Sequence, residues 1–271
     1  MEAYQIAEEI SKCKNNPERR DFVERMARNA AESLGYTLRP QPILDNKGNP
    51  INPIRGNANF LLDSGHPSPL TITAHYDAWF VDAETGFVPG ANDNGSGVGA
   101  LFQSMPELEG FPIDFILFGD EEKGLRGPKF YADNMASFKF PGAIVSLDSC
   151  GSGKPGILLP SEVKFRENLL PTSSKLNKHY LEAAQKSGLM TFTDCPWATT
   201  DYVRFIDKGI PSAAILGNDL DYYGFVNGKL EKGEGQRHTM QDTIDCVDPK
   251  FLEQVVQTLV EGSKNFVKSR R

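Results

Sequence analysis

Three apolar segments of this chain end in, or run into, side chains that bind metal ions well. They are Leu70–His75 (LTITAH), Pro112–Gly119 (PIDFILFG, followed by Glu121 and Glu122) and Ala143–Asp148 (AIVSLD). Short continuous apolar runs of this kind predict strands that are buried on both faces of a sheet. Ligands of open α/β sheets bind at the carboxyl ends of the strands, so the same pattern predicts where a site would lie.

Amphipathic segments alternate with these strands along the chain. The alternation predicts an α/β fold, a three-layer α/β/α sandwich around a central mixed, mostly parallel sheet. We expect residues 1–271 to form one domain, with two helices in residues 1–35 packing on it. Helices are also expected at 95–108, 125–136, 174–187, 200–208 and from Asp248 to about Lys268, and further strands at Asn57–Asp63 and Pro211–Leu216.

The charge balance narrows the class of partner. The formal net charge is -7, which disfavours nucleic acid and anionic membranes as partners. The first residues lack the basic and apolar regions of a signal peptide, so a cytoplasmic protein is expected, with secretion of a processed form left open.

The four cysteines form no CxxC motif and are expected to be free thiols, with a Cys150–Cys195 pair as the alternative.

Five side chains form a candidate metal-binding set. Two imidazoles and three carboxylates suit zinc, and one bridging carboxylate would complete two metal positions. Metal ions about 3.5–4 Å apart share a water and lower its pKa toward neutrality. We therefore expect two Zn²⁺ per chain. The candidate ligands are His75, Asp93, Glu122, Asp148 and His238.

Two further acidic residues fit supporting roles. Of the neighbouring Glu121 and Glu122, one can bind metal while the other takes a proton from the water. Asp77, two residues after His75, fits a partner that orients the imidazole.

Six segments, taken in order, resemble the zinc aminopeptidases of the clan that also holds glutamate carboxypeptidase and glutaminyl cyclase. They are AHYDAW, GANDNGSG, FGDEEKGLRG, SLDSCG, TTDYVRF and RHTMQDT, and the resemblance covers roughly residues 57–267. It implies a zinc exopeptidase-like fold. Family members with a lid or protease-associated domain are longer, and we expect neither domain in these 271 residues. The resemblance also implies that His75 and Asp148 bind different metal ions and that Asp93 bridges them. Glu122 and His238 would complete the two positions, and Glu121 would be the catalytic base.

The resemblance bears on two local features, the peptide bond after Asp93 and the residue before His238. It implies a cis peptide bond at Asp93-Asn94. Many relatives carry a tyrosine before the last histidine, whereas this chain has Arg237. A guanidinium at that place would stabilise an oxyanion, the hypothesis we favour, or bind a substrate carboxylate.

Substrate contacts are expected from aromatic residues near the site. Tyr222 and Tyr223 lie in a Gly-rich, charged insertion, residues 217–236, which is expected to be an irregular rim. Trp197 is a further candidate, although packing in the core or at the rim would explain each of these aromatics as well.

The sequence is compatible with four functions. The first is an aminopeptidase that hydrolyses the N-terminal peptide bond of a peptide or aminoacyl substrate through a metal-bound hydroxide, with Glu121 as base. The others are a carboxypeptidase or deacylase of small amides, a single-zinc glutaminyl cyclase, and a scaffold without activity, as in the transferrin receptor. Intact GANDNGSG together with His75 and Asp148 favours the peptidase over the cyclase. The sequence predicts no oligomeric state.

Overall fold

The central sheet has eight strands in the order β1-β2-β6-β3-β7-β12-β8-β11. The structure is a computed structural model that describes residues 1–45, 47–50, 58–152, 156–217, 223–226, 229–232 and 236–270. Strands β6, β3, β7 and β12 are parallel neighbours at the centre, and the edges contain antiparallel pairs. The strands are β1 (Thr37–Pro42), β2 (Ala58–Asp63), β3 (Leu70–His75), β6 (Ile113–Phe118), β7 (Ile144–Asp148), β8 (Gly156–Leu158), β11 (Met190–Phe192) and β12 (Ser212–Gly217).

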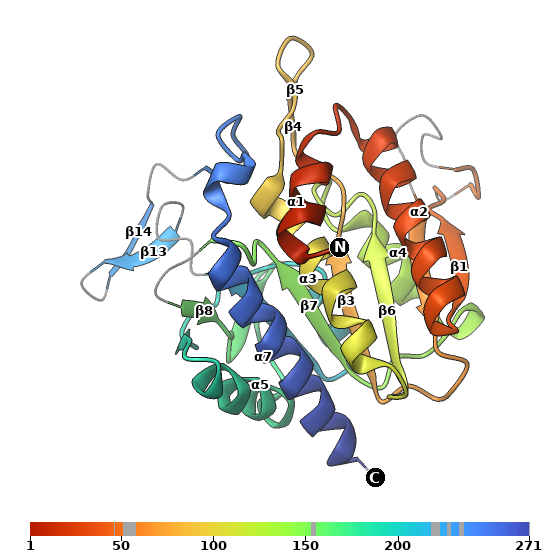
Figure 1. The fold of residues 1–271 in the computed structure, drawn as a ribbon, viewed down its shortest axis with the longest axis vertical. Helices are drawn as coiled ribbons and strands as arrows, with labels where there is room; N and C mark the ends of the chain where they lie inside the picture. The colour runs from red at the N-terminus through yellow and green to blue at the C-terminus, as the bar shows by residue number, and fades with distance from the viewer. Residues whose placement is uncertain are drawn as a thin grey trace.

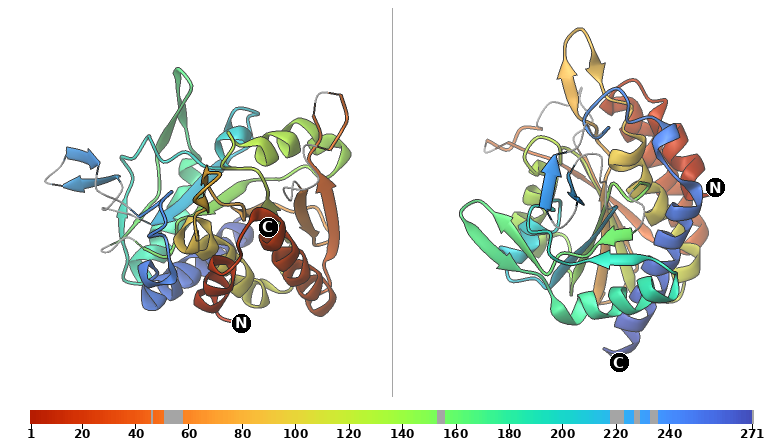
Figure 2. Two further views of the ribbon diagram at one scale, coloured as in Figure 1. Left: turned by 90° about the horizontal axis from the view of Figure 1, so that it is seen from above. Right: turned by 90° about the vertical axis from the view of Figure 1, so that its left-hand side faces the viewer.

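Helices cover both faces of the sheet, which confirms the three-layer α/β/α architecture. Ile72 and Val145 belong to an apolar cluster that also contains residues of α1, α2, α3, α5 and α7, while Ile116 and Ala214 belong to a second cluster with residues of α4 and α6. Figure 1 shows α1, α3 and α7 in front of the sheet, and the right view of Figure 2 shows these helices on one side of it. The helices are α1 (Ala3–Ser11), α2 (Asn16–Leu34), α3 (Gly97–Ser104), α4 (Arg126–Asn134), α5 (Ser174–Lys186), α6 (Val203–Ile206) and α7 (Pro249–Lys268).

Local sequence signals explain where the long helices begin and end. Gly35 follows α2 with a φ of 76°, a left-handed conformation that glycine adopts without a steric penalty. The Asp248 side chain accepts hydrogen bonds from the N–H groups of Lys250 and Phe251 at the start of α7, with Pro249 at the first helical position. Within the described residues, no helix is both long and apolar enough to span a membrane.

Three hairpins extend from this core. They are β4 (Phe80–Asp82) with β5 (Gly86–Phe87), β9 (Glu162–Phe165) with β10 (Asn168–Pro171), and β13 (Tyr223–Val226) with β14 (Lys229–Lys232). The β4–β5 hairpin projects at the top of Figure 1. The sequence predicted that residues 217–236 are irregular. This prediction was wrong for the part that the structure describes, because β13 and β14 form an antiparallel pair within it.

Candidate metal centre

The strands that carry three candidate ligands are neighbours in the sheet. His75 is the last residue of β3 and lies beside Phe118, the last residue of β6. On the other side of β3, Ala74 lies beside Leu147, which precedes Asp148 at the end of β7. The register therefore brings His75, Asp148 and the loop with Glu121 and Glu122 to one edge of the sheet.

Asp93 reaches the same edge from a tight turn before α3. The turn spans Ala91–Ser96 and follows Gly90, whose φ is 60°. The Asp93-Asn94 peptide bond is cis, as the family resemblance implies. The Asn94 amide donates to the Leu147 carbonyl over 2.8 Å, and its oxygen accepts from the Ser149 N–H over 3.2 Å. Asn94 thus fixes the Asp93 turn against the end of β7.

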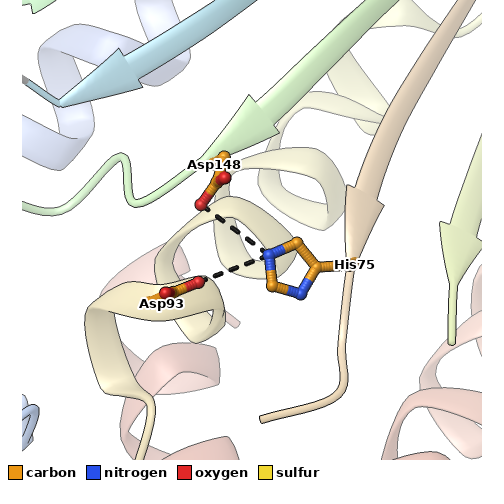
Figure 3. Close-up of side chains that lie close together, drawn as sticks. All are labelled: His75, Asp93 and Asp148. Carbon is orange, nitrogen blue, oxygen red and sulfur yellow. Dashed lines mark ion pairs between the residues drawn. The ribbon is translucent and has the colours of Figure 1, made fainter. Parts of the chain in front are cut away.

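The first group of candidate ligands is His75, Asp93 and Asp148. His75 Nε2 lies 3.3 Å from Asp93 Oδ1 and 3.7 Å from Asp148 Oδ1. Figure 3 shows one nitrogen of the imidazole facing both carboxylates. All three residues are buried, and one ligand atom from each lies within 4.8 Å of the others.

The second group shares Asp93 with the first. His238 Nε2 lies 3.1 Å from Asp93 Oδ2 and 3.2 Å from Glu122 Oε2. The two oxygens of Asp93 therefore face different groups. A carboxylate in this position can bridge two cations, and the structure brings together the five candidate ligands that the sequence suggested.

These residues fit zinc on two physical grounds. The set combines imidazole nitrogens with carboxylate oxygens, which Zn²⁺ accepts at about 2.0–2.2 Å. Among the described residues, His75 Nε2 and Asp93 Oδ1 are buried and make no hydrogen bond, although they lie 3.3 Å apart. Buried polar atoms are normally satisfied, so two ligand-type atoms that face each other without a hydrogen bond fit a place for a cation.

The electrostatics of the site also favour a cation. Burial alone would lower the pKa of both imidazoles. The surrounding carboxylates, led by Glu121, nevertheless raise the pKa of His75 well above its usual value. Hydrogen bonds to Asp93 and Glu122 outweigh burial at His238 and raise its pKa to about 10. The carboxylates thus favour positive charge at both imidazoles, at the place where divalent cations would bind.

Asp77 connects the loop after β6 to His75. Its two carboxylate oxygens accept the N–H groups of Glu121 and Glu122 over 3.0 and 3.2 Å. Asp77 Oδ1 lies 3.6 Å from His75 Nδ1, beyond an ordinary hydrogen bond. The side chain thus orients the two glutamates directly and the imidazole more loosely. Burial, partly offset by His75, raises the pKa of Glu121 well above its usual value.

Arg237 lies against both groups of ligands. Its Nε donates to Asp93 Oδ2 over 2.7 Å, and its Nη2 donates to Asp148 Oδ2 over 3.0 Å. Burial opposes the charge of Arg237, but Asp148 and Asp93 raise the pKa of its guanidinium well above the usual value. Two of its donors are therefore engaged by candidate metal ligands.

Of the three aromatic residues predicted to contact substrate, only Trp197 has a side chain that the structure describes. Tyr222 lies outside the described residues, as does the side chain of Tyr223, whose backbone begins β13. Trp197 is partly buried and packs against the apolar cluster under α4 and α6. Trp79 stacks on His238 with ring centroids 4.6 Å apart and an interplanar angle of 11°, and it is 38% exposed. Trp79 thus forms part of the rim of the metal centre.

Two residues with clear positions at the site were given no role by the sequence reading. Asp242 accepts the N–H groups of Asn92 and Asp93 over 2.7 and 3.0 Å. Its place in RHTMQDT was the available signal. Arg19 of α2 is buried and donates to the carbonyls of Val88 and Pro89, just before the Asp93 turn. It lies more than 50 residues before the first ligand, and no pattern linked it to the site.

Comparisons with known proteins show which family and which solved structures this chain resembles. The model of Peptidase family M28 matches residues 60–262. The chain is 29% identical over 214 residues to aminopeptidase YwaD of Bacillus subtilis, covering 76% of this chain and 43% of that protein. It is 30% identical over 181 residues to aminopeptidase Y of Saccharomyces cerevisiae, covering 64% and 32%. The chain thus spans less than half the length of these relatives.

Two solved structures of similar length share the fold. A Zn-dependent exopeptidase from Parabacteroides distasonis has a TM-score of 0.72 and 19% identity, and the match covers 97% of both chains. A glutaminyl cyclase from Bacteroides thetaiotaomicron has a TM-score of 0.72 and 21% identity, covering 97% of this chain and 96% of that one. At these identities the comparisons support the fold alone.

Proposed function

The chain belongs to Peptidase family M28, and from this premise we propose that it is a zinc-dependent aminopeptidase that hydrolyses the N-terminal peptide bond of a peptide or aminoacyl substrate. The observation that carries the proposal is the sharing of Asp93 between two ligand groups beside Glu121. The relatives named as aminopeptidases support removal of N-terminal residues rather than C-terminal ones.

The residues take distinct roles in this proposal. Two zinc ions, when bound, would polarise the scissile carbonyl and lower the pKa of the attacking water. His75, Asp93 and Asp148 would hold one ion, and Asp93, Glu122 and His238 the other.

Glu121 would take the proton of the water and pass it to the leaving amine. This carboxylate is buried and belongs to neither ligand group, so it is available for proton transfer. Asp77 fixes the backbone of Glu121 through its N–H and so positions the base.

Matched blocked and unblocked substrates test this function. Purified protein would be given aminoacyl peptides, their N-acetyl forms and their C-terminal amides, with metal content measured on the same sample. Cleavage that needs a free N-terminus and tolerates the amide supports an aminopeptidase. Cleavage that needs a free C-terminus supports a carboxypeptidase. Cyclisation of N-terminal glutamine with one zinc per chain would replace the proposal by a cyclase, and no bound metal and no turnover would leave a scaffold.

A further inference from the structure

Arg237 contacts the two groups of ligands unequally. Its Nε donates to Asp93 Oδ2, the same oxygen that faces His238 Nε2. On Asp148 it contacts Oδ2, whereas Asp148 Oδ1 faces His75. The three atoms of the first group (His75 Nε2, Asp93 Oδ1 and Asp148 Oδ1) thus remain free of the guanidinium, while the second group shares one of its oxygens with it.

The charges of the ligand set reinforce this asymmetry. Asp93, Asp148 and Glu122 supply three negative charges when ionised, and the two imidazoles are neutral when they bind metal. One divalent ion together with the Arg237 guanidinium balances those three charges. A second divalent ion adds positive charge that the ligand set does not balance, in a partly buried place where charges interact strongly.

The two positions also differ in their surroundings. The side chain of His75 is fully buried at the end of a central strand, whereas that of His238 is 26% exposed. His238 lies in a loop, its own φ is 61°, and its ring stacks on Trp79. A more exposed ligand on a loop is less well fixed in place, which lowers the affinity of its metal position further.

We propose that Arg237 makes the two metal positions unequal, because it competes with the ion between Asp93, Glu122 and His238 for Asp93 Oδ2. This inference rests on the proposed function in that it assumes two metal positions. The position of His75, Asp93 and Asp148 fills first and tightly. The second position fills only at higher metal concentration, when the guanidinium yields Asp93 Oδ2, so the second ion is the exchangeable one.

The test is a metal titration that does not depend on catalysis. Metal-free protein would be titrated with Co²⁺, followed by calorimetry and by the visible absorption of the bound ion. The wild type is expected to show two binding steps with clearly separated dissociation constants. The Arg237→Met variant is expected to bind the second ion about 10- to 100-fold more tightly, the range over which partners of metal ligands act, with the first step changed much less.

Control variants assign the steps and exclude general effects. His238→Ala should remove the weaker step and leave the tighter one. Arg39→Met removes an arginine that pairs with the buried Asp63 over 2.9 Å, away from the site, and should leave both steps unchanged. Thermal unfolding of each variant would confirm that it is folded.

Several results would overturn the proposal. They are two equal steps in the wild type, an Arg237→Met variant with an unchanged second step, or a variant in which both steps weaken, which would make Arg237 a positioning residue for the carboxylates. Hydrolysis of the peptide panel on the same samples separates this inference from the proposed function. Two unequal steps without hydrolysis uphold the inference and reject the peptidase, and two equal steps with hydrolysis do the reverse.

Discussion

Glu121 and Glu122 are neighbours in the chain, but their side chains have different surroundings. Glu122 faces His238 and Asp93, whereas Glu121 is buried outside both ligand groups. Glu121→Gln should therefore lower kcat by about 100- to 10,000-fold, the contribution of general acid–base catalysis, with the metal content unchanged. The measurements are kcat on an aminoacyl substrate and elemental analysis after dialysis.

Glu122→Gln is the matched control for that change. It removes a ligand, so it should lose metal from the second position as well as activity. A Glu121→Gln protein that keeps the wild-type rate, or that loses metal as Glu122→Gln does, would contradict the assignment of the base.

Asp201 is a buried carboxyl whose ionisation should reduce the stability of the metal-free protein. Burial raises its pKa to about 7, and the Asp201 carboxyl accepts a hydrogen bond from the Thr73 hydroxyl over 3.1 Å. An unfolded aspartate ionises near pH 4. Since the folded state holds its proton up to a higher pH, the contribution of Asp201 to stability falls as pH rises from about 4 to about 7, and is then constant.

The Asp201→Asn variant isolates this effect because the amide keeps an acceptor for Thr73 and does not titrate. Relative to this variant, the metal-free wild type should lose on the order of 4 kcal/mol of unfolding free energy between pH 4 and 8, from a shift of about three pKa units. Urea unfolding at a series of pH values measures the difference. A difference between the two proteins that stays constant with pH would show that Asp201 ionises normally.

Helix α2 holds the loops of the metal centre through two polar side chains. Asn16 accepts the Ala78 N–H over 2.9 Å, and Arg19 donates to the Val88 and Pro89 carbonyls. These contacts fix the chain just after Asp77 and just before the Asp93 turn. The family match begins at residue 60, so α2 is an element outside the matched region that supports the site.

Arg19→Met should loosen the Asp93 turn and lower the affinity for zinc. Loss of the two hydrogen bonds to Val88 and Pro89 destabilises the folded protein. Part of this cost is offset, because the substitution also removes a buried positive charge with two nitrogens that lack a partner. The unfolding free energy should therefore fall by about 1–3 kcal/mol. Competition with a chromophoric chelator measures zinc affinity. Arg28→Met, an exposed position on the same helix, should change stability by no more than about 0.5 kcal/mol. Equal behaviour of the two variants would remove the supporting role of α2.

The sequence predicted the elements that carry a strong local signal. The central strands, the long helices and the end of α2 at Gly35 follow from apolar periodicity and capping residues, and the structure confirms them. The edge strands β8 and β11 have three residues each, too few to show a period, and they were missed. The β4–β5 hairpin was missed for the same reason.

The sequence could predict the candidate ligands that lie at the ends of strands. It could not predict contacts between side chains that are far apart in the chain. His75 and Asp148 could be placed from the strands that they end, and the register of β3 and β7 brings them together. The contacts of Arg237 with Asp93 and Asp148 could not be predicted, because they depend on how residues 144 and 89 positions apart meet in space. A motif shows which residue types are present, and only the fold shows which of them contact one another.

At the scale of the whole molecule, the metal centre joins segments that are far apart in the chain. Its candidate ligands come from residues 75 to 238, and the unfolded chain does not hold them together. Metal ions should therefore bind almost only to the folded state, and their binding free energy should add to the stability of the whole fold. Removing them should destabilise the protein well beyond the local site.

Chelation should consequently lower the Tm of the whole protein in one cooperative step. An ion present at 1,000 times its Kd contributes about 4 kcal/mol, and in a chain of this size each kcal/mol shifts Tm by about 2–4 °C. Loss of the tighter ion alone should therefore lower Tm by about 8–16 °C, measured by calorimetry with and without chelator. Glu121→Gln keeps all five ligands and should show the same drop, whereas Asp93→Asn lacks the shared carboxylate and should respond little. A wild-type Tm that chelator leaves unchanged would mean that the five side chains do not hold metal in the folded protein.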